Sequence, residues 1–135
     1  ENRIYLWGVY PVANPYFMHF NKSEDLKFIV GPMFGIINRH DMDLKLTINE
    51  KENTERTLKY YVKDGKVLRY NNITIKTNYY KNKGGMQSFN RDRINNSKKS
   101  ANYLHKKYPS LTKIKVRKTT GITEVQLKNK INKIK

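Results

Sequence analysis

A short run at residues 40–45 carries side chains that could hold a metal ion or move a proton. The run contains His40, Asp41, Asp43 and Lys45. The pattern Asp43-Leu44-Lys45 matches the carboxylate–lysine half of a nuclease-type site, in which the carboxylate holds a metal ion and the lysine orients water. Glu24 or Asp25 would supply the second carboxylate. The same run is typical of a solvated turn before a strand, so a small metal-dependent nuclease is a minor alternative.

Other catalytic patterns are missing from the sequence. The 135 residues contain no cysteine, which excludes a disulfide scaffold, a thiolate metal site and a cysteine nucleophile. Nothing resembles H-E-x-x-H or G-x-S-x-G, and Gly84-Gly85 lacks the lysine and hydroxyl positions of a phosphate-binding loop. No run of about 18 apolar residues is present that would cross a membrane. We therefore expect a non-catalytic protein with no cofactor and no metal.

The charge distribution is the strongest functional feature. The chain carries 28 Lys and Arg against 11 Asp and Glu, a net charge of +17. Residues 81–135 hold 16 of these cations and only 2 of the acids. AT-rich codons encode Lys, Asn, Ile and Tyr, so codon bias accounts for part of the lysine excess. Codon bias would not remove acidic residues from one end, however, so the asymmetry indicates an anionic partner.

The expected partner is a polyanion, either nucleic acid or an anionic envelope polymer or membrane surface. Such a ligand binds through charge neutralisation and release of its counterions. The residues expected to make these contacts are Lys98, Lys99, Lys106, Lys107, Lys113, Lys115, Arg117 and Lys118. Tyrosines and a phenylalanine among the cations would suit base stacking. We find no sequence pattern of an established nucleic-acid-binding motif.

The spacing of apolar and polar residues along the chain predicts an α+β fold. Alternation of apolar and polar residues over 42–48, 58–62 and 73–79 predicts an antiparallel β-meander within about residues 28–80. Asp64-Gly65 is typical of a hairpin turn in this meander. The apolar runs on either side of Gly31-Pro32 predict two further buried strands.

After Gly84-Gly85 the period of the apolar residues changes. Ile94, Ala101, Leu104 and Tyr108 form one stripe of a helix that Pro109 ends. Residues 113–117 alternate as a strand, with Lys113, Lys115 and Arg117 on one face. Thr123 and Gln126 fit a capping box, which predicts a C-terminal helix from about residue 123. We expect one α+β domain over residues 1–135.

The segment from residue 4 to residue 21 is uncharged and rich in aromatic residues. Its prolines and glycine exclude a long helix, so we expect an extended segment, such as an edge strand, that caps the core. An alternative is a belt of aromatic residues at a membrane interface. The chain starts with Glu1, which indicates a processed or trimmed piece.

The second hypothesis is therefore an exported or membrane-tethered domain of an AT-rich organism that binds a protein partner. In that case we expect an extracytoplasmic or membrane-tethered location, and otherwise a cytoplasmic one.

Overall fold

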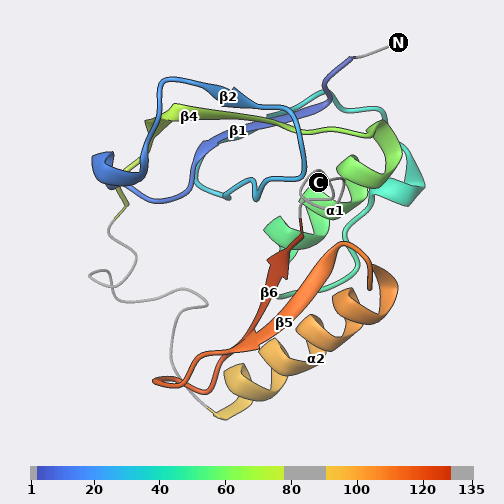
Figure 1. Cartoon of the computed structure of the whole chain (residues 1–135). Coiled ribbons are helices and arrows are strands. Elements are labelled where there is room, and N and C mark those ends of the chain that lie inside the picture. The colour runs from blue at the N-terminus through green and yellow to red at the C-terminus, as the bar shows by residue number, and fades with distance from the viewer. Residues whose placement is uncertain (1–2, 78–90, 129–135) are drawn as a thin grey trace.

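The computed structural model describes residues 3–77 and 91–128 and has a mixed α+β fold, as the sequence predicts. In these residues a four-stranded sheet and a two-stranded sheet accompany two α-helices (Figure 1). None of the helices in the described ranges combines the length and the apolar character of a bilayer-crossing segment.

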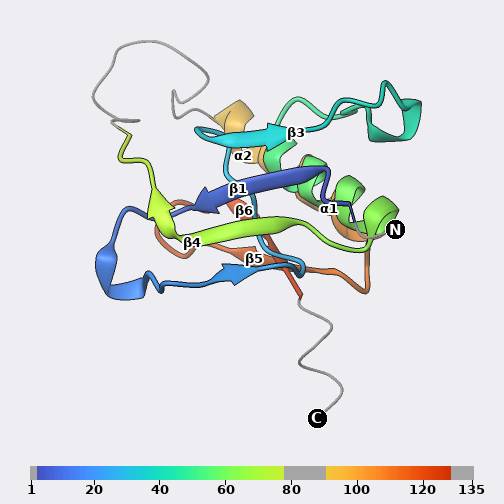
Figure 2. The same ribbon diagram turned by 90° about the horizontal axis from the view of Figure 1, so that it is seen from above.

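The four-stranded sheet has the order β2-β4-β1-β3. Its strands are β1 (Leu6–Tyr10), β2 (Lys22–Ser23), β3 (Phe34–Ile36) and β4 (Leu68–Thr74). The two central strands, β1 and β4, run parallel, whereas β2 and β3 join at the edges in antiparallel pairs. Figure 2 shows this sheet from above, with the parallel central pair between its two edge strands.

Helix α1 (Glu52–Asp64) connects the four-stranded sheet to the rest of the core. Tyr60 belongs to a buried cluster with Leu6 of β1 and with Ile29 and Val67. Leu58 belongs to a second buried cluster, which joins it to other leucines of the chain: Leu26, Leu104 and Leu111. One helix therefore supplies residues to both clusters.

The prediction of a strand at residues 58–62 is wrong, because these residues lie in α1. Leu58, Tyr60 and Val62 alternate in sequence, but Val62 is exposed while Leu58 and Tyr60 are buried. The segment obeys the helical period through Thr54, Leu58 and Tyr61, and the polar Thr54 hides that stripe. Asp64-Gly65 ends this helix instead of turning a hairpin: Gly65 has φ +79°, and its N–H bonds to the Tyr61 carbonyl at 2.8 Å.

The prediction of an antiparallel meander within residues 28–80 is also wrong. Residues 42–48 form no strand; Met42–Leu44 is a short 3-10 helix, η2. Strand β4 pairs with β1 in parallel and ends at Thr74, while residues 78 and 79 lie outside the described ranges. Of the two strands expected around Gly31-Pro32, only the second forms a described strand, β3. In the first run, the Ile29 N–H bonds to Thr57 Oγ1 of α1 at 3.2 Å instead of joining a ladder.

The described part of the basic C-terminal region folds as a helix packed on a hairpin. Helix α2 (Arg91–Lys107) confirms the helix predicted before Pro109. Strand β5 (Thr112–Val116) confirms the strand predicted after it. The hairpin partner β6 (Thr123–Leu127) pairs with β5 from Thr112 opposite Leu127 to Val116 opposite Thr123.

The prediction that a C-terminal helix begins near residue 123 is wrong for the described residues. Thr123, Val125 and Leu127 alternate on one face of β6, a pattern that the capping residues Thr123 and Gln126 conceal. Pairing with β5 satisfies the backbone of this segment, and the buried Thr123 carbonyl accepts a bond from Ser97 of α2 at 2.9 Å. Residues 129–135 lie outside the described ranges.

The N-terminal segment divides into two parts. Its beginning forms β1, which lies inside the sheet between β3 and β4 and is not an edge strand. Its remainder, residues 12–20, projects beyond the sheet and contains the 3-10 helix η1 (Pro15–Phe17), seen at the left of Figure 1. Only the first part contributes to the core, through Leu6 and Val9.

Candidate polyanion-binding surface

Helix α2 is positioned by contacts along one side. Ser97, Ala101 and Leu104 are buried there. The Ser97 hydroxyl donates to β6, and His105 Nδ1 lies 3.0 Å from the Thr112 hydroxyl of β5. The side of α2 that carries these residues therefore faces the hairpin, and its opposite side faces solvent.

All eight cations predicted to bind a polyanion are exposed. They are Lys98, Lys99, Lys106, Lys107, Lys113, Lys115, Arg117 and Lys118. Exposure leaves their charges available to a ligand from solution. The structure nevertheless divides them between different surfaces.

The first four lie on α2, and two of them mark the middle of its outer face. Lys99 and Lys106 each follow a buried residue, Ser97 or Leu104, by two positions, which is about 200° around a helix. They therefore point almost directly away from the hairpin. The helix rise places them about 10 Å apart along its axis.

The cations of β5 point the other way. Thr112 faces α2 through His105, so alternation along the strand turns Lys113 and Lys115 to the opposite side of the hairpin. Arg117 lies on that side as well, since its guanidinium pairs with Glu124, the residue opposite Lys115. These seven cations thus form two separate surfaces on opposite sides of the helix–hairpin unit, and do not form one face. Lys118 lies in the turn after β5.

The two surfaces differ in how much of their charge is neutralised. On the hairpin, Arg117 Nε lies 2.5 Å from Glu124 Oε1. On α2, the described residues give Lys98, Lys99 and Lys106 no ion pair. The outer face of α2 is therefore the more strongly cationic of the two.

Lys107 is held by aromatic rings at the end of α2. Its Nζ lies 5.8 Å from the ring centre of Tyr103 and 5.6 Å from that of Tyr108. Burial lowers the pKa of Lys107, but attraction to Tyr108 and Tyr103 outweighs it, so the pKa lies above its usual value. The ammonium group therefore stays charged beside the two rings.

Two asparagines complete the outer face of α2, and the sequence analysis did not single them out. Asn95 and Asn102 are exposed. Together with Lys99 and Lys106 they follow the helical offsets 0, 4, 7 and 11, so amides and ammonium groups alternate along one stripe. This spacing is the feature of the sequence that could have identified the two asparagines as part of the face. Amide groups can donate to phosphate oxygens or to base edges, so the stripe offers more than charge.

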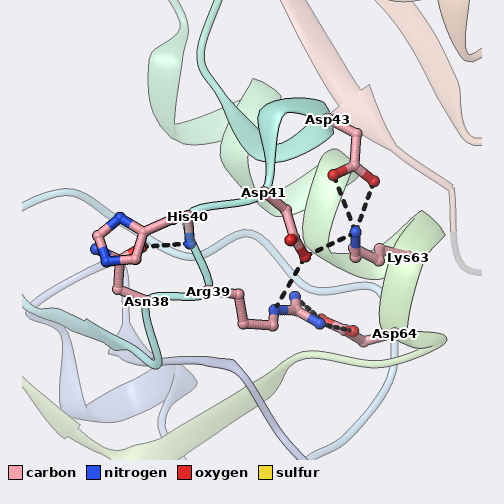
Figure 3. Close-up of polar contacts among 7 residues, drawn as sticks. All are labelled: Asn38, Arg39, His40, Asp41, Asp43, Lys63 and Asp64. Atoms are coloured by element: carbon pink, nitrogen blue, oxygen red, sulfur yellow. Dashed lines mark hydrogen bonds and ion pairs between the residues drawn. The ribbon is translucent and has the colours of Figure 1, made fainter.

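The candidate nuclease residues form an ion-pair network instead (Figure 3). Lys63 near the end of α1 bonds to both Asp43 oxygens, at 2.9 and 2.8 Å, and pairs with Asp41 at 2.9 Å. Arg39 makes a two-point contact with Asp64 at 2.7 and 2.8 Å. The hydrogen bond from Lys63 holds the pKa of Asp43 below its usual value. These contacts tie residues 39–43 to the end of α1.

The remaining nuclease residues are not gathered at this network. The carboxylates of Glu24 and Asp25 lie near Lys22 and Lys27, at 3.8 and 3.9 Å. The His40 N–H bonds to Asn38, and the Lys45 carbonyl accepts a bond from Lys59. Within residues 3–77 and 91–128, no three His, Asp or Glu side chains are grouped so that they could hold a metal ion.

Comparisons with known proteins supply no function for this arrangement. A scan of protein-family models, a search of curated proteins and a search of solved structures each find no match.

Proposed function

We propose that the protein is a non-catalytic module that docks the outer face of α2 on a polyanion such as nucleic acid or an anionic envelope polymer. The observation that carries this proposal is the row of exposed lysines on the side of α2 opposite its buried face. Helix α2 contains a single acidic residue, Asp92, near its beginning. Most of the outer face is therefore free of opposing charge.

Binding through this face would follow from counterion release. Each lysine that neutralises a phosphate or similar group frees a condensed cation from the polymer, which makes the affinity fall steeply with salt. Lys99 and Lys106 lie in the middle of the face, and Lys98 and Lys107 lie at its sides. The hairpin surface is the weaker candidate, because Glu124 neutralises Arg117 and would repel a polyanion near Lys115.

The test is a salt titration of binding to duplex DNA, single-stranded RNA and vesicles of phosphatidylglycerol. The Lys99→Ser/Lys106→Ser variant should show a log–log salt slope on the preferred ligand that is shallower by about two. Both side chains are exposed on the outside of the helix, so we expect the free energy of unfolding to stay within about 0.5 kcal/mol of the wild-type value.

The matched control is Lys113→Ser/Lys115→Ser, which removes the same charge from the opposite surface. Its salt slope should change by less than about one unit. Equal losses in the two variants would mean that net charge alone, and not the α2 face, controls binding. The same conclusion would follow if the wild type bound every ligand weakly and alike.

A further inference from the structure

Residues 12–20 expose large apolar side chains at a protruding end of the molecule. The exposed fraction is 84% for Tyr16, 51% for Phe17 and 99% for Phe20, and Val12 is exposed as well. The loop that carries them leaves the sheet after β1 and returns at β2, at the left of Figure 1, whereas α2 lies at the lower right. Leaving aromatic rings in water is unfavourable, so such a cluster marks a contact surface.

The backbone of this loop has already satisfied its own hydrogen-bond donors. From residue 14 to residue 19 every N–H is bonded, except at Pro15, which has none. The bonds join Asn14 to Val12, Tyr16 to the Asn14 side chain, Phe17 to Asn14, Met18 to Pro15 and His19 to Asn71. Because these five N–H groups are bonded and the segment has no Lys, Arg, Asp or Glu, its removal from water costs less free energy than that of an open loop.

The loop is also held firmly at its base. The buried Asn71 of β4 donates to Asn21 Oδ1 and to Ser23 Oγ, both at 2.9 Å. Its backbone N–H and carbonyl bond to Asn21 and His19. The tip is therefore presented in one conformation, which lowers the entropy that a contact would cost.

Cations line a cavity of about 770 Å³ behind the aromatic tip. They come from Arg69 and from Lys27, which also lies 3.9 Å from the Asp25 carboxylate. His19 and the aromatic rings of Tyr10 and Tyr16 line the cavity beside them. Arg69 is fixed there, because its Nε donates to Asn71 at 2.9 Å and its guanidinium lies 5.1 Å from the Tyr10 ring centre. Burial lowers the pKa of Arg69, and the nearby Tyr10 and Asp25 partly compensate.

We infer that residues 12–20 insert their aromatic tip into the headgroup region of an anionic lipid bilayer, with Lys27 and Arg69 facing the lipid phosphates. Tyrosine and phenylalanine are suited to that boundary, where rings meet the acyl chains and polar groups meet water. The net charge of +17 favours an anionic membrane over a neutral one. A protruding uncharged tip with bonded N–H groups fits a lipid phase better than it fits a polyanion, which needs exposed cations.

The test is sedimentation with vesicles, using the full chain and the variant Tyr16→Ser/Phe17→Ser/Phe20→Ser. The wild type should partition onto equimolar phosphatidylglycerol and phosphatidylcholine more strongly than onto phosphatidylcholine alone. The variant should lose at least about tenfold in the partition coefficient, since three apolar side chains no longer leave water. Its binding to duplex DNA and to single-stranded RNA should be unchanged, which keeps this test separate from that of the α2 face.

The matched control removes three other exposed apolar side chains, which belong to η2, α1 and β5. They are Met42, Val62 and Val116, with exposed fractions of 77%, 57% and 56%, each changed to Ser. This control should partition like the wild type. Because the chain has no cysteine, Phe20→Cys and Met42→Cys can each carry one polarity-sensitive dye. Vesicles should shift the emission of the dye to the blue at position 20 and not at position 42.

Three results would overturn the inference. The first is equal loss of partitioning in the aromatic variant and in the matched control. The second is retention of vesicle binding by the aromatic variant and its loss in Lys99→Ser/Lys106→Ser, which would place the contact on α2. The third is lipid-free self-association of the wild type in sedimentation velocity that the aromatic variant lacks, without vesicle binding, because the tip would then contact a second copy.

Discussion

The two α-helices differ in where they place charged side chains. Helix α1 buries two of them, whereas the lysines of α2 are exposed to solvent. Glu55 of α1 is 0% exposed and Lys59 is 7% exposed. Glu55 accepts bonds from the Thr47 N–H at 2.7 Å and from its hydroxyl at 2.5 Å, while Lys59 Nζ donates to the Lys45 carbonyl at 2.5 Å. The lysines of the outer face of α2 are exposed and have no such role.

The buried charged side chains of α1 stabilise the fold, whereas those of α2 are available to a ligand. Residues 45–48 form neither helix nor strand. The hydrogen bonds of Glu55 and Lys59 hold this segment against α1. A buried charge is costly unless its hydrogen bonds are made, so these positions should tolerate little change. The exposed lysines of α2 should affect binding with little effect on stability. Net charge alone cannot distinguish the two groups.

The largest effect on stability is expected for Glu55→Ala. The substitution removes a buried side chain and the acceptor of the Thr47 N–H and hydroxyl, so the free energy of unfolding should fall by about 2–3 kcal/mol. Urea denaturation measures the loss. Glu52→Ala, an exposed position on the same helix, should cost less than about 1 kcal/mol. Similar losses at the two positions would remove the distinction between buried and exposed charge on α1.

A smaller loss is expected for Lys59→Met. Methionine fills much of the same space but leaves the Lys45 carbonyl without its donor, so unfolding should become easier by about 1–2 kcal/mol. Thermal unfolding followed by circular dichroism measures this change. Lys45→Met leaves that carbonyl bond in place and should be close to neutral. A neutral Lys59→Met protein would show that burial of Lys59 contributes nothing to holding the loop.

The smallest effect is expected for the exposed pair of Lys63 and Asp43. Since the folded-state pKa of Asp43 is lowered, its contribution is complete above the unfolded pKa of about 3.9 and is lost as the pH falls through the folded pKa. Asp43→Asn should therefore flatten the acid side of the stability profile slightly at low ionic strength. Added salt should remove the difference. If the stability of wild type and variant fell equally with decreasing pH at low salt, Asp43 would not have a lowered pKa in the folded protein.

The sequence predicted an element correctly where its apolar residues followed a single period, either helical or alternating. The apolar stripe of α2 has no competing alternation, and Pro109 follows its end, so the helix could be predicted. In α1 the residues Leu58, Tyr60 and Val62 also alternate, and the buried Thr54 and Glu55 make its inner side appear polar. Thr123 likewise begins both a capping pattern and an alternating strand. Tertiary packing determines whether such a segment becomes a helix or a strand. A short window of sequence carries no information about that packing.

The exposure of the eight cations was predictable from the sequence, but their arrangement on the molecule was not. Exposure of the eight cations follows from their charge. The division of seven of them into two surfaces depends on which side of the hairpin α2 covers, and that depends on contacts between Thr112 and His105 and between Ser97 and Thr123. The network of Lys63 with Asp41 and Asp43 joins residues about 20 positions apart, so no local pattern indicated it.

The parallel pairing of β1 with β4 has a consequence for the order of folding. It joins residues 7–10 to residues 68–74, so a loop of about sixty residues must close before the centre of the large sheet can form. Helix α2 and its hairpin contact one another within residues 91–128, over much shorter separations. Contacts close in sequence form faster than distant ones. During synthesis β1 must therefore wait for β4, whereas α2 and its hairpin can assemble as soon as they emerge.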